Sequence, residues 1–261
     1  MPSLIARSAV TPLFAQPSLR AEQVSQLVLG ETAAVEETSD QWLRVRCDHD
    51  GYEGWVHSGY VVQTDDVAAD RWRREASAWS LGATLAVAGR RVRLPLRARV
   101  APDGARVCLP DGRRAELVEG EVPPAADVAA SARASAPERW ALDHFEGAPY
   151  EWGGVTPWGV DCSGLVQTTF AARGLALPRD AALQADLGDT IRPGDHAPGD
   201  LLFFRGESAE RITHVAFSAE GDTLIHSTVS CGGVLVEPWL PGTRAAVLRE
   251  RLVAVRRLEA R

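Results

Sequence analysis

The chain contains no lysine, since all 28 of its basic residues are arginine. A protein without lysine cannot carry the lysine of a Walker A phosphate-binding loop, a Schiff-base lysine or a serine–lysine dyad. Several classes of enzyme are therefore excluded, and any covalent catalysis must use another nucleophile.

An excess of basic charge and long apolar runs are also missing. The formal net charge is −7, and no basic run is interleaved with aromatic residues, as a nucleic-acid partner would require. No apolar run reaches the 18 residues expected of a membrane span, so we expect no membrane partner. The 261 residues, 45% of them hydrophobic, can form two or three small domains with ordinary cores.

Residues 1–10 lack both a basic segment and a continuous apolar stretch of the kind found in signal peptides. We therefore expect a cytoplasmic protein. The alternative, that a leader has been removed from the chain, stays open. The four cysteines, Cys47, Cys108, Cys162 and Cys231, show no CxxC or other metal-ligand spacing, so we expect no metal and no cofactor. Cysteines without a disulfide framework fit a reducing compartment.

One cysteine lies where a helix should begin. Apolar residues recur at helical spacing after Cys162, and Gly174 is a natural end to that helix. The free N–H groups and positive dipole of a helix start favour an anion, so a thiolate is expected at Cys162. A buried structural cysteine is the alternative. Two later histidines, His214 and His226, each within a short apolar strand-like run and separated by a turn signal at 219–222, favour a catalytic set.

The second half of the chain resembles the NlpC/P60 cysteine peptidases of bacterial cell walls, which have a papain-like α+β fold. The resemblance covers residues 137–261 and follows the family's order of motifs: Tyr150-x-Trp152-Gly153-Gly154, Asp161-Cys162-Ser163-Gly164, Pro178-Arg179-Asp180, Pro198-Gly199-Asp200, Thr213-His214-Val215 and Ile225-His226-Ser227. It implies that Cys162 is the nucleophile, that His214 is the base and that His226 orients His214.

An oxyanion formed at Cys162 needs hydrogen-bond donors, and the Cys162 backbone N–H is the first candidate. Tyr150 is the candidate for the second donor, with packing at the helix start as its alternative. Trp152, Asp161 and Ser163 flank the nucleophile and are expected to line the substrate groove.

The first half reads as short strands separated by turns, which is typical of small β-barrels. Residues 1–66 resemble a bacterial SH3 domain, and its most specific part is Gly51-Tyr52-Glu53-Gly54-Trp55-Val56. Strands are expected at residues 10–14, 26–29, 32–36, 42–46 and 54–56. Residues 67–122 suggest a second, degenerate SH3-like barrel, with strands at 91–96, 105–109 and 113–118. An alanine-rich linker, 123–136, precedes the peptidase domain and has helical character.

An SH3-like module ahead of such a peptidase resembles the γ-D-glutamyl-L-diamino acid endopeptidases, which cut murein peptides with a free amino-terminal L-Ala. A bound ammonium needs a carboxylate, for which Asp180 is the main candidate. The alternative role of Asp180 is to cap a helix over 181–187. Glu22 and Tyr52 of the first barrel are further candidates, with a solvated charge as the alternative for Glu22 and with Glu31 as the rival acid.

These observations predict a cytoplasmic cysteine peptidase that hydrolyses the γ-D-Glu–diamino acid bond of murein peptides in cell-wall recycling. Two alternatives stay open: an exported hydrolase that binds polymeric peptidoglycan, and an acyltransferase or amidase with the same Cys–His chemistry. The sequence leaves open which diamino acid, diaminopimelate or lysine, is recognised, and what the oligomeric state is.

Overall fold

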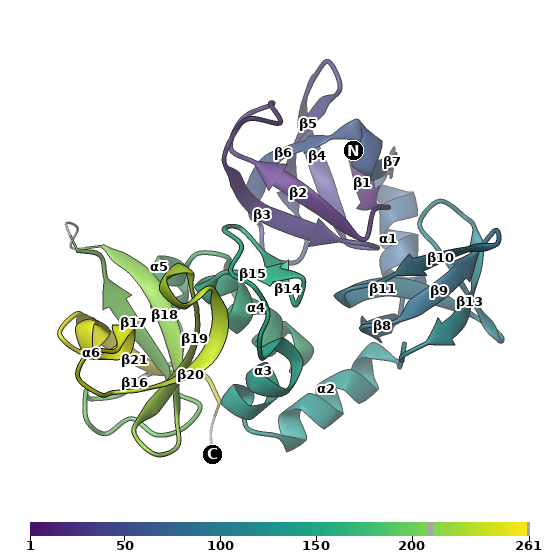
Figure 1. Ribbon diagram of the computed structural model, residues 1–261. Helices are drawn as coiled ribbons and strands as arrows, with labels where there is room; N and C mark the ends of the chain where they lie inside the picture. Colours follow the sequence, from purple (N-terminus) through teal and green to yellow (C-terminus); the bar gives the residue numbers. More distant parts are fainter. Residues whose placement is uncertain (208–210, 260–261) are drawn as a thin grey trace. The chain divides into compact units, whose positions relative to one another are not determined.

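The computed structural model describes residues 1–207 and 211–259. The chain divides into two compact units, Met1–Ala129 and Ala130–Arg261 (Figure 1). Among the described residues, no helix combines the length and the apolar character needed to cross a membrane.

The first unit begins with a seven-stranded antiparallel sheet in the order β3-β2-β6-β5-β4-β1-β7. Its strands are β1 Pro2–Ala6, β2 Val10–Phe14, β3 Gln23–Val28, β4 Thr32–Ser39, β5 Trp42–Cys47, β6 Glu53–His57 and β7 Val61–Asp65, with a 3₁₀ turn, η1, at Ser58–Tyr60. Alternation along β5 buries Leu43 and Val45 and leaves Arg44 and Arg46 less buried. The inward side chains form a core with Leu13, Leu27 and Val56.

A second sheet of six antiparallel strands follows, in the order β10-β9-β13-β12-β11-β8. Its strands are β8 Ala78–Leu81, β9 Thr84–Val87, β10 Arg90–Arg93, β11 Leu96–Asp103, β12 Arg106–Cys108 and β13 Arg114–Glu119. It has a separate core, in which Leu85, Val87, Val100 and Val107 are buried.

Helix α1, Asp66–Glu75, connects the two sheets of the first unit. Its Trp72 packs between Ile5 of the first sheet and Ala101 of the second, and the Trp72 indole N–H donates to the Gly30 carbonyl at 2.8 Å. Close by, Arg97 Nε lies 2.9 Å from Glu31 Oε1, with both side chains buried. The two sheets are therefore packed into one body.

The second unit contains a six-stranded antiparallel sheet in the order β16-β21-β17-β18-β19-β20. Its strands are β16 Asp189–Thr190, β17 Leu201–Arg205, β18 Ile212–Ala219, β19 Thr223–Thr228, β20 Gly233–Pro238 and β21 Leu252–Arg257. A short hairpin, β14 Val155–Thr156 and β15 Gly159–Val160, lies ahead of these in the chain. The predicted hairpin between the two histidine-bearing strands is confirmed, because β18 pairs with β19.

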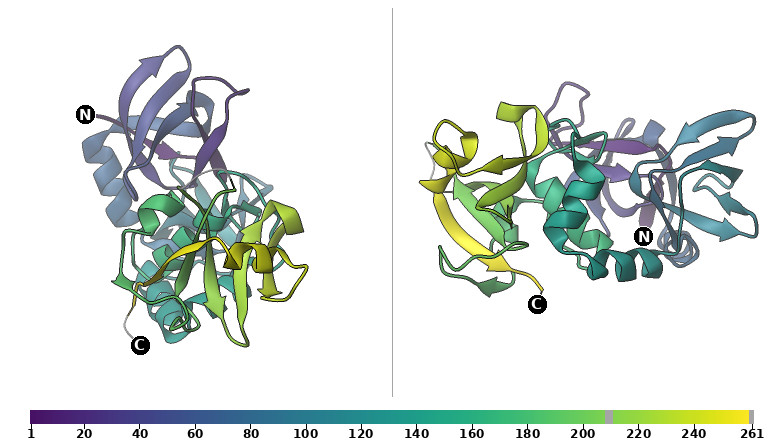
Figure 2. Two further views of the ribbon diagram at one scale, coloured as in Figure 1. Left: turned by 90° about the vertical axis from the view of Figure 1, so that its left-hand side faces the viewer. Right: turned by 60° about the horizontal axis from the view of Figure 1, so that its bottom comes forward.

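Helices cover this sheet, whose strands run from green to yellow in Figure 2. They are α3 Pro137–Phe145, α4 Cys162–Ala172, α5 Ala181–Gln184 and α6 Arg244–Arg249. Helix α2, Ala125–Ala134, precedes them in the chain and crosses the boundary of the two units. Helix α4 is buried along most of its length and packs against β18 and β19, with Phe170 stacked on Phe217. Helix α6 contributes Ala245 and Leu248 to a second cluster that includes Leu224.

The predicted helix after Cys162 is confirmed. It ends at Ala172, and Gly174 follows with a φ of +82°. This backbone conformation is one that glycine adopts without steric cost, which is why a glycine commonly follows a helix end.

Candidate active site

The start of α4 is fixed by Asp161, its N-cap residue. The Asp161 backbone is extended, and its Oδ1 accepts the Gly164 N–H at 2.7 Å, which satisfies one of the free donors at the helix start. A Cβ atom at Gly164 would lie 2.1 Å from the Gly154 carbonyl oxygen, so only glycine fits there. The motif Asp161 to Gly164 therefore encodes the capped first turn of the helix together with a close loop contact.

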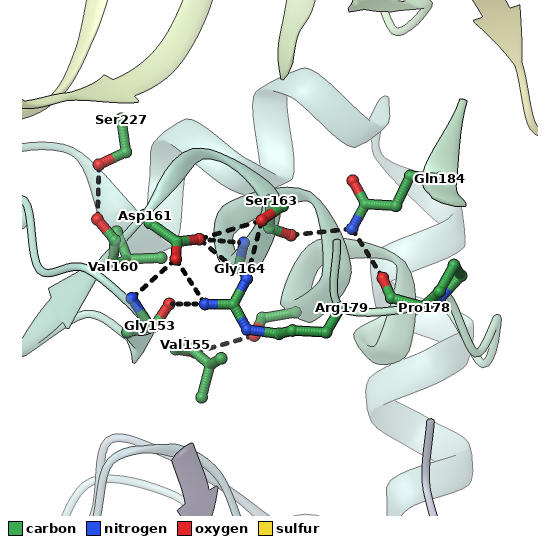
Figure 3. Close-up of polar contacts among 12 residues, drawn as sticks. Gly153, Val155, Val160, Asp161, Ser163, Gly164, Pro178, Arg179, Gln184 and Ser227 are labelled. Atoms are coloured by element: carbon green, nitrogen blue, oxygen red, sulfur yellow. Dashed lines mark hydrogen bonds and ion pairs between the residues drawn. The ribbon is translucent and has the colours of Figure 1, made fainter. Parts of the chain in front are cut away.

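A buried arginine holds this first turn in place (Figure 3). Arg179 NH1 donates to Asp161 Oδ1 at 3.0 Å and to Ser163 Oγ at 2.8 Å, while NH2 donates to Asp161 Oδ2 at 2.5 Å. Arg179 is 2% exposed, Asp161 5% and Ser163 7%. Asp161 and Ser163 were expected to line the substrate groove, but their side chains are engaged inside the protein. Arg179 of the predicted motif Pro178-Arg179-Asp180 thus pairs with an acidic residue of the motif that contains Cys162.

Cys162 is the first residue of α4 and is 8% exposed. Burial raises the pKa of its thiol to about 12, and the charge of Asp161 acts in the same direction. The backbone N–H groups of Val215 and Ser163 interact with the sulfur and oppose this shift without cancelling it. Burial therefore opposes the thiolate that the helix start was expected to favour.

The two histidines meet across adjacent strands. His214 Nε2 lies 2.9 Å from His226 Nδ1, and the two rings are nearly perpendicular. His214 is half-buried and His226 fully buried. Burial lowers the pKa of each imidazole to about 3, and the positive charge of Arg244 contributes. Since Val215 contacts the Cys162 sulfur, the strand that carries His214 lies against the start of α4.

Tyr150 also lies near the sulfur. Burial is the main cause that raises the pKa of its hydroxyl above the usual value. Electrostatic interactions with Cys162 and Asp161 raise this pKa further. The phenol therefore stays protonated at neutral pH and keeps a hydrogen-bond donor beside the nucleophile. Trp152 is 57% exposed on the same segment, where it offers an aromatic surface to solvent.

Asp180 precedes α5 but does not cap it with its side chain. Helix α5 has only four residues, Ala181–Gln184, where the sequence suggested 181–187. Among the described residues, the exposed Asp180 carboxylate has no hydrogen bond or ion pair. Asp180 thus occupies the predicted N-cap position, but its side chain forms no capping hydrogen bond, so the carboxylate remains available to a ligand.

The candidates of the first barrel lie in the other unit. Glu22 is exposed and Tyr52 is half-buried, and their part in substrate binding stays a prediction. Glu31, the rival acid, is 5% exposed, paired with Arg97 and hydrogen-bonded to the Val28 N–H. Its carboxylate is thus used to hold the first unit together.

In the part of the chain that the structure describes, one group of three side chains lies close enough together to be considered as a metal site. Cys47 Sγ, a ring nitrogen of His49 and a carboxylate oxygen of Asp50 lie within 4.8 Å of one another. Cys47 belongs to the barrel core, and burial raises the pKa of its thiol well above the usual range. Because a protonated core thiol is a poor ligand, we assign no metal to this group. Cys231, by contrast, is exposed in the turn η2, Val229–Cys231.

Two family models match the chain. Residues 147–256 match the NlpC/P60 family, and residues 13–59 match the bacterial dipeptidyl-peptidase SH3 domain. Both matches confirm the resemblances that the motifs suggested, one in each unit.

Related proteins match part of the second unit. The γ-D-glutamyl-L-lysine dipeptidyl-peptidase of Bacillus subtilis is 43% identical over 84 residues, which are 32% of this chain and 28% of that protein. The probable endopeptidase NlpC of Escherichia coli is 40% identical over 92 residues, which are 35% of this chain and 60% of that protein. The chain thus aligns with between about a quarter and three fifths of these relatives.

A solved structure matches nearly the whole chain. The crystal structure of an NlpC/P60 family protein from Bacillus cereus superposes with a TM-score of 0.77 over 98% of this chain and 99% of that one, at 21% identity. This likeness shows a shared fold.

Proposed function

We propose that this chain, which carries an NlpC/P60 domain and an SH3 domain of the bacterial dipeptidyl-peptidase type, is a cysteine peptidase of murein peptides. It would hydrolyse the γ-D-Glu–diamino acid bond of peptides with a free amino-terminal L-Ala. The contact of 2.9 Å between His214 and His226, on a strand whose Val215 touches the Cys162 sulfur, is the observation that carries the proposal. The printed name of the Bacillus subtilis relative, which refers to γ-D-glutamyl-L-lysine, supports the substrate class.

Catalysis would begin from a neutral thiol and a neutral imidazole, because burial opposes both charges. His214 Nε2 is engaged with His226, so Nδ1 is the ring nitrogen left to accept a proton. As the Cys162 sulfur bonds to the substrate carbonyl carbon, its proton moves to His214 Nδ1. The imidazolium then protonates the leaving amine, and a water activated by His214 hydrolyses the thioester.

The oxyanion of each tetrahedral intermediate would be bound by the Cys162 backbone N–H and the Tyr150 hydroxyl. A donor is useful there only if it keeps its proton at neutral pH. The raised pKa of Tyr150 supports this role.

The free amino group of L-Ala would be bound by Asp180. An ammonium held close to protein needs a carboxylate partner. Asp161 is occupied by Arg179, whereas Asp180 is exposed and makes no ion pair with any residue of the described ranges.

The first test is the nucleophile. Cys162→Ala should abolish cleavage of L-Ala-γ-D-Glu-meso-diaminopimelate, measured by mass spectrometry, with the thermal unfolding transition preserved. Cys231→Ala, which removes an exposed thiol, is the matched control and should retain full activity. Cleavage that persists in Cys162→Ala would rule out the proposed chemistry.

The second test concerns the substrate terminus. The wild-type protein should cleave the free peptide faster than its N-acetylated form, and Asp180→Asn should raise KM for the free peptide alone. Equal turnover of both peptides by the wild type would contradict the proposed amine site.

We also propose that the protein acts in the cytoplasm on soluble peptides from wall turnover. A catalytic thiol accompanied by three further free cysteines fits a reducing compartment. The protein should stay in solution when purified sacculi are sedimented. Sedimentation with the sacculi and cleavage of the polymer would favour an exported wall hydrolase instead.

A further inference from the structure

The polar contacts of the catalytic strands do not end at the second histidine. His226 Nε2 lies 3.1 Å from Glu237 Oε2, with His226 fully buried and Glu237 6% exposed. Strand pairing explains the contact: β19 places His226 opposite Leu235 of β20, and Glu237 is two residues further on the same face. Three adjacent strands thus contribute His214, His226 and Glu237 in a row.

Glu237 is held in place from its other side by α6. Its Oε1 accepts the Arg244 N–H at 2.8 Å, and its Oε2 accepts the Ala245 N–H at 2.9 Å. Both oxygens therefore act as acceptors, as those of an ionised carboxylate do. The carboxylate cannot turn away from His226 without giving up these bonds to the helix start.

Glu237 also faces Nε2 of His226, the ring nitrogen that points away from His214. His226 Nε2 is buried and has no hydrogen-bond partner of standard geometry among the described residues, and Glu237 Oε2 lies within ion-pairing distance of it. At 3.1 Å the interaction is electrostatic, and an acceptor at this distance favours a proton on Nε2. A carboxylate in this position therefore biases the tautomer of His226.

We propose that Glu237 is a positioning residue that sets the tautomers of both histidines, an inference that rests on the proposed function of Cys162 and His214. With its proton on Nε2, His226 presents an unprotonated Nδ1. His214 must then donate from Nε2, which leaves its Nδ1 unprotonated and ready to receive the proton of Cys162. When the S–H bond breaks and the S–C bond forms, His214 becomes an imidazolium that still donates to His226.

The negative charge of Glu237 favours proton transfer to His214, as the proposed tautomers do. Within the described ranges, the charged groups shown to act on the histidine pair are Arg244 of α6 and Glu237 of β20. Cys162 at the start of α4 lies against Val215 of the strand that carries His214. Arg244 opposes a second positive charge on the imidazoles. Glu237 is a carboxylate in direct contact with His226, and through this histidine it stabilises the imidazolium that appears on His214 during turnover.

Glu237→Gln tests the proposal, because the amide has nearly the same shape but no charge. Either orientation of the amide gives up one of the two bonds to α6, and with its N–H at the Oε2 position it faces His226 Nε2, which reverses the hydrogen bonds and places a proton on His214 Nδ1. We expect kcat to fall about 10- to 100-fold with little change in KM, less than the ~10⁴-fold loss seen when a triad carboxylate becomes an amide. The acid limb of the kcat/KM profile should also shift, since the imidazolium is less stable.

A matched control distinguishes an effect of Glu237 on the histidines from an effect on the stability of α6. Thr243 Oγ1 accepts the Ala246 N–H and caps α6 without touching the histidines. Thr243→Ala should lower the melting temperature at least as much as Glu237→Gln does, while leaving kcat and the pH profile unchanged. Equal changes of kcat in both variants would show that Glu237 acts only through the helix.

The histidine tautomers can be read without substrate. The chain has six histidines, so ¹⁵N-histidine NMR can resolve their ring nitrogens, with His214→Gln and His226→Gln giving the assignments. In the wild type, both rings should carry the proton on Nε2, and in Glu237→Gln the proton should move to Nδ1. Unchanged tautomers in Glu237→Gln would overturn the proposal, whatever the substrate proves to be. Loss of the proposed function alone would appear in the Cys162→Ala assay and not in these spectra.

Discussion

At the scale of single residues, burial decides the protonation of the reacting groups. Cys162 is held as a thiol, and His214 and His226 are held as neutral imidazoles, because a charge on any of them would be poorly solvated. Tyr150 keeps its proton for the same reason. The resting site is therefore uncharged at its reacting atoms, and charge would develop only when a substrate occupies it.

Tyr150→Phe should lower kcat by about 100-fold with little change in KM, because one oxyanion donor is lost. Steady-state kinetics on L-Ala-γ-D-Glu-meso-diaminopimelate would measure both constants. Tyr60→Phe is the matched control, since Tyr60 lies in η1 of the first unit and should be silent. A fully active Tyr150→Phe would leave Tyr150 with a packing role only.

At the scale of elements, the start of α4 depends on one buried ion pair. Asp161 both caps the helix and binds Arg179, so the arginine supports the orientation of Cys162 without contacting the sulfur. A planar guanidinium can serve both carboxylate oxygens and the Ser163 hydroxyl at once. The loop that carries Arg179 is thereby fastened to the first turn of the helix.

Arg179→Met should lower the free energy of unfolding of the second unit by about 3–5 kcal/mol, because the Asp161 charge is left buried without a partner. Calorimetry at neutral pH would measure the loss. Arg205→Met, at the exposed end of β17, is the control and should stay within about 0.5 kcal/mol of the wild type. If adding Asp161→Asn to Arg179→Met restores no stability, the unpaired charge is not the cause.

The sequence revealed the elements that local patterns encode. The period of apolar residues and a terminal glycine predicted α4, and turn residues predicted the hairpin of the two histidines. Strands β1 and β7 were missed, because they are adjacent in the sheet but more than 50 residues apart in the sequence, so no turn signal joins them. The sign of the Cys162 pKa shift was missed as well, since it depends on how deeply the helix start is buried.

Contacts between distant segments set the rest of the site. Nothing in the spacing of Asp161 and Arg179 indicates that their side chains meet. Glu237 belongs to no motif, and only the register of β19 against β20 brings it to His226. Sequence reasoning found Cys162, His214 and the candidate orienting residue His226, and it missed Glu237, which contacts His226.

At the scale of the whole molecule, the first unit is larger than one barrel. Trp72 of α1 donates to Gly30, and Glu31 pairs with Arg97, so side chains beyond the first sheet bind the turn between β3 and β4. A Cβ at Gly30 would lie 2.2 Å from the Arg99 carbonyl oxygen, which shows how closely the two sheets approach. The first barrel should therefore depend on the second for its stability.

A fragment of residues 1–129 should show one cooperative thermal transition by circular dichroism. A fragment of residues 1–66 should melt at a lower temperature or remain unfolded, because Glu31 loses Arg97 and the Trp72 contacts are absent. Equal melting temperatures for the two fragments would contradict this dependence. Arg97→Met in the full chain provides a second measure and should weaken the same transition.

The exposed thiol of Cys231 has a practical consequence for inhibitor studies. Cys231 belongs to the turn between the strands of His226 and Glu237, and the next residue, Gly232, accepts the Tyr150 N–H through its carbonyl. An alkylating reagent would therefore meet this solvent-facing sulfur before the buried one at Cys162, and the adduct would sit beside the Tyr150 segment. Inactivation by such a reagent would not identify the nucleophile, so covalent screens need a protein in which Cys231 has been replaced.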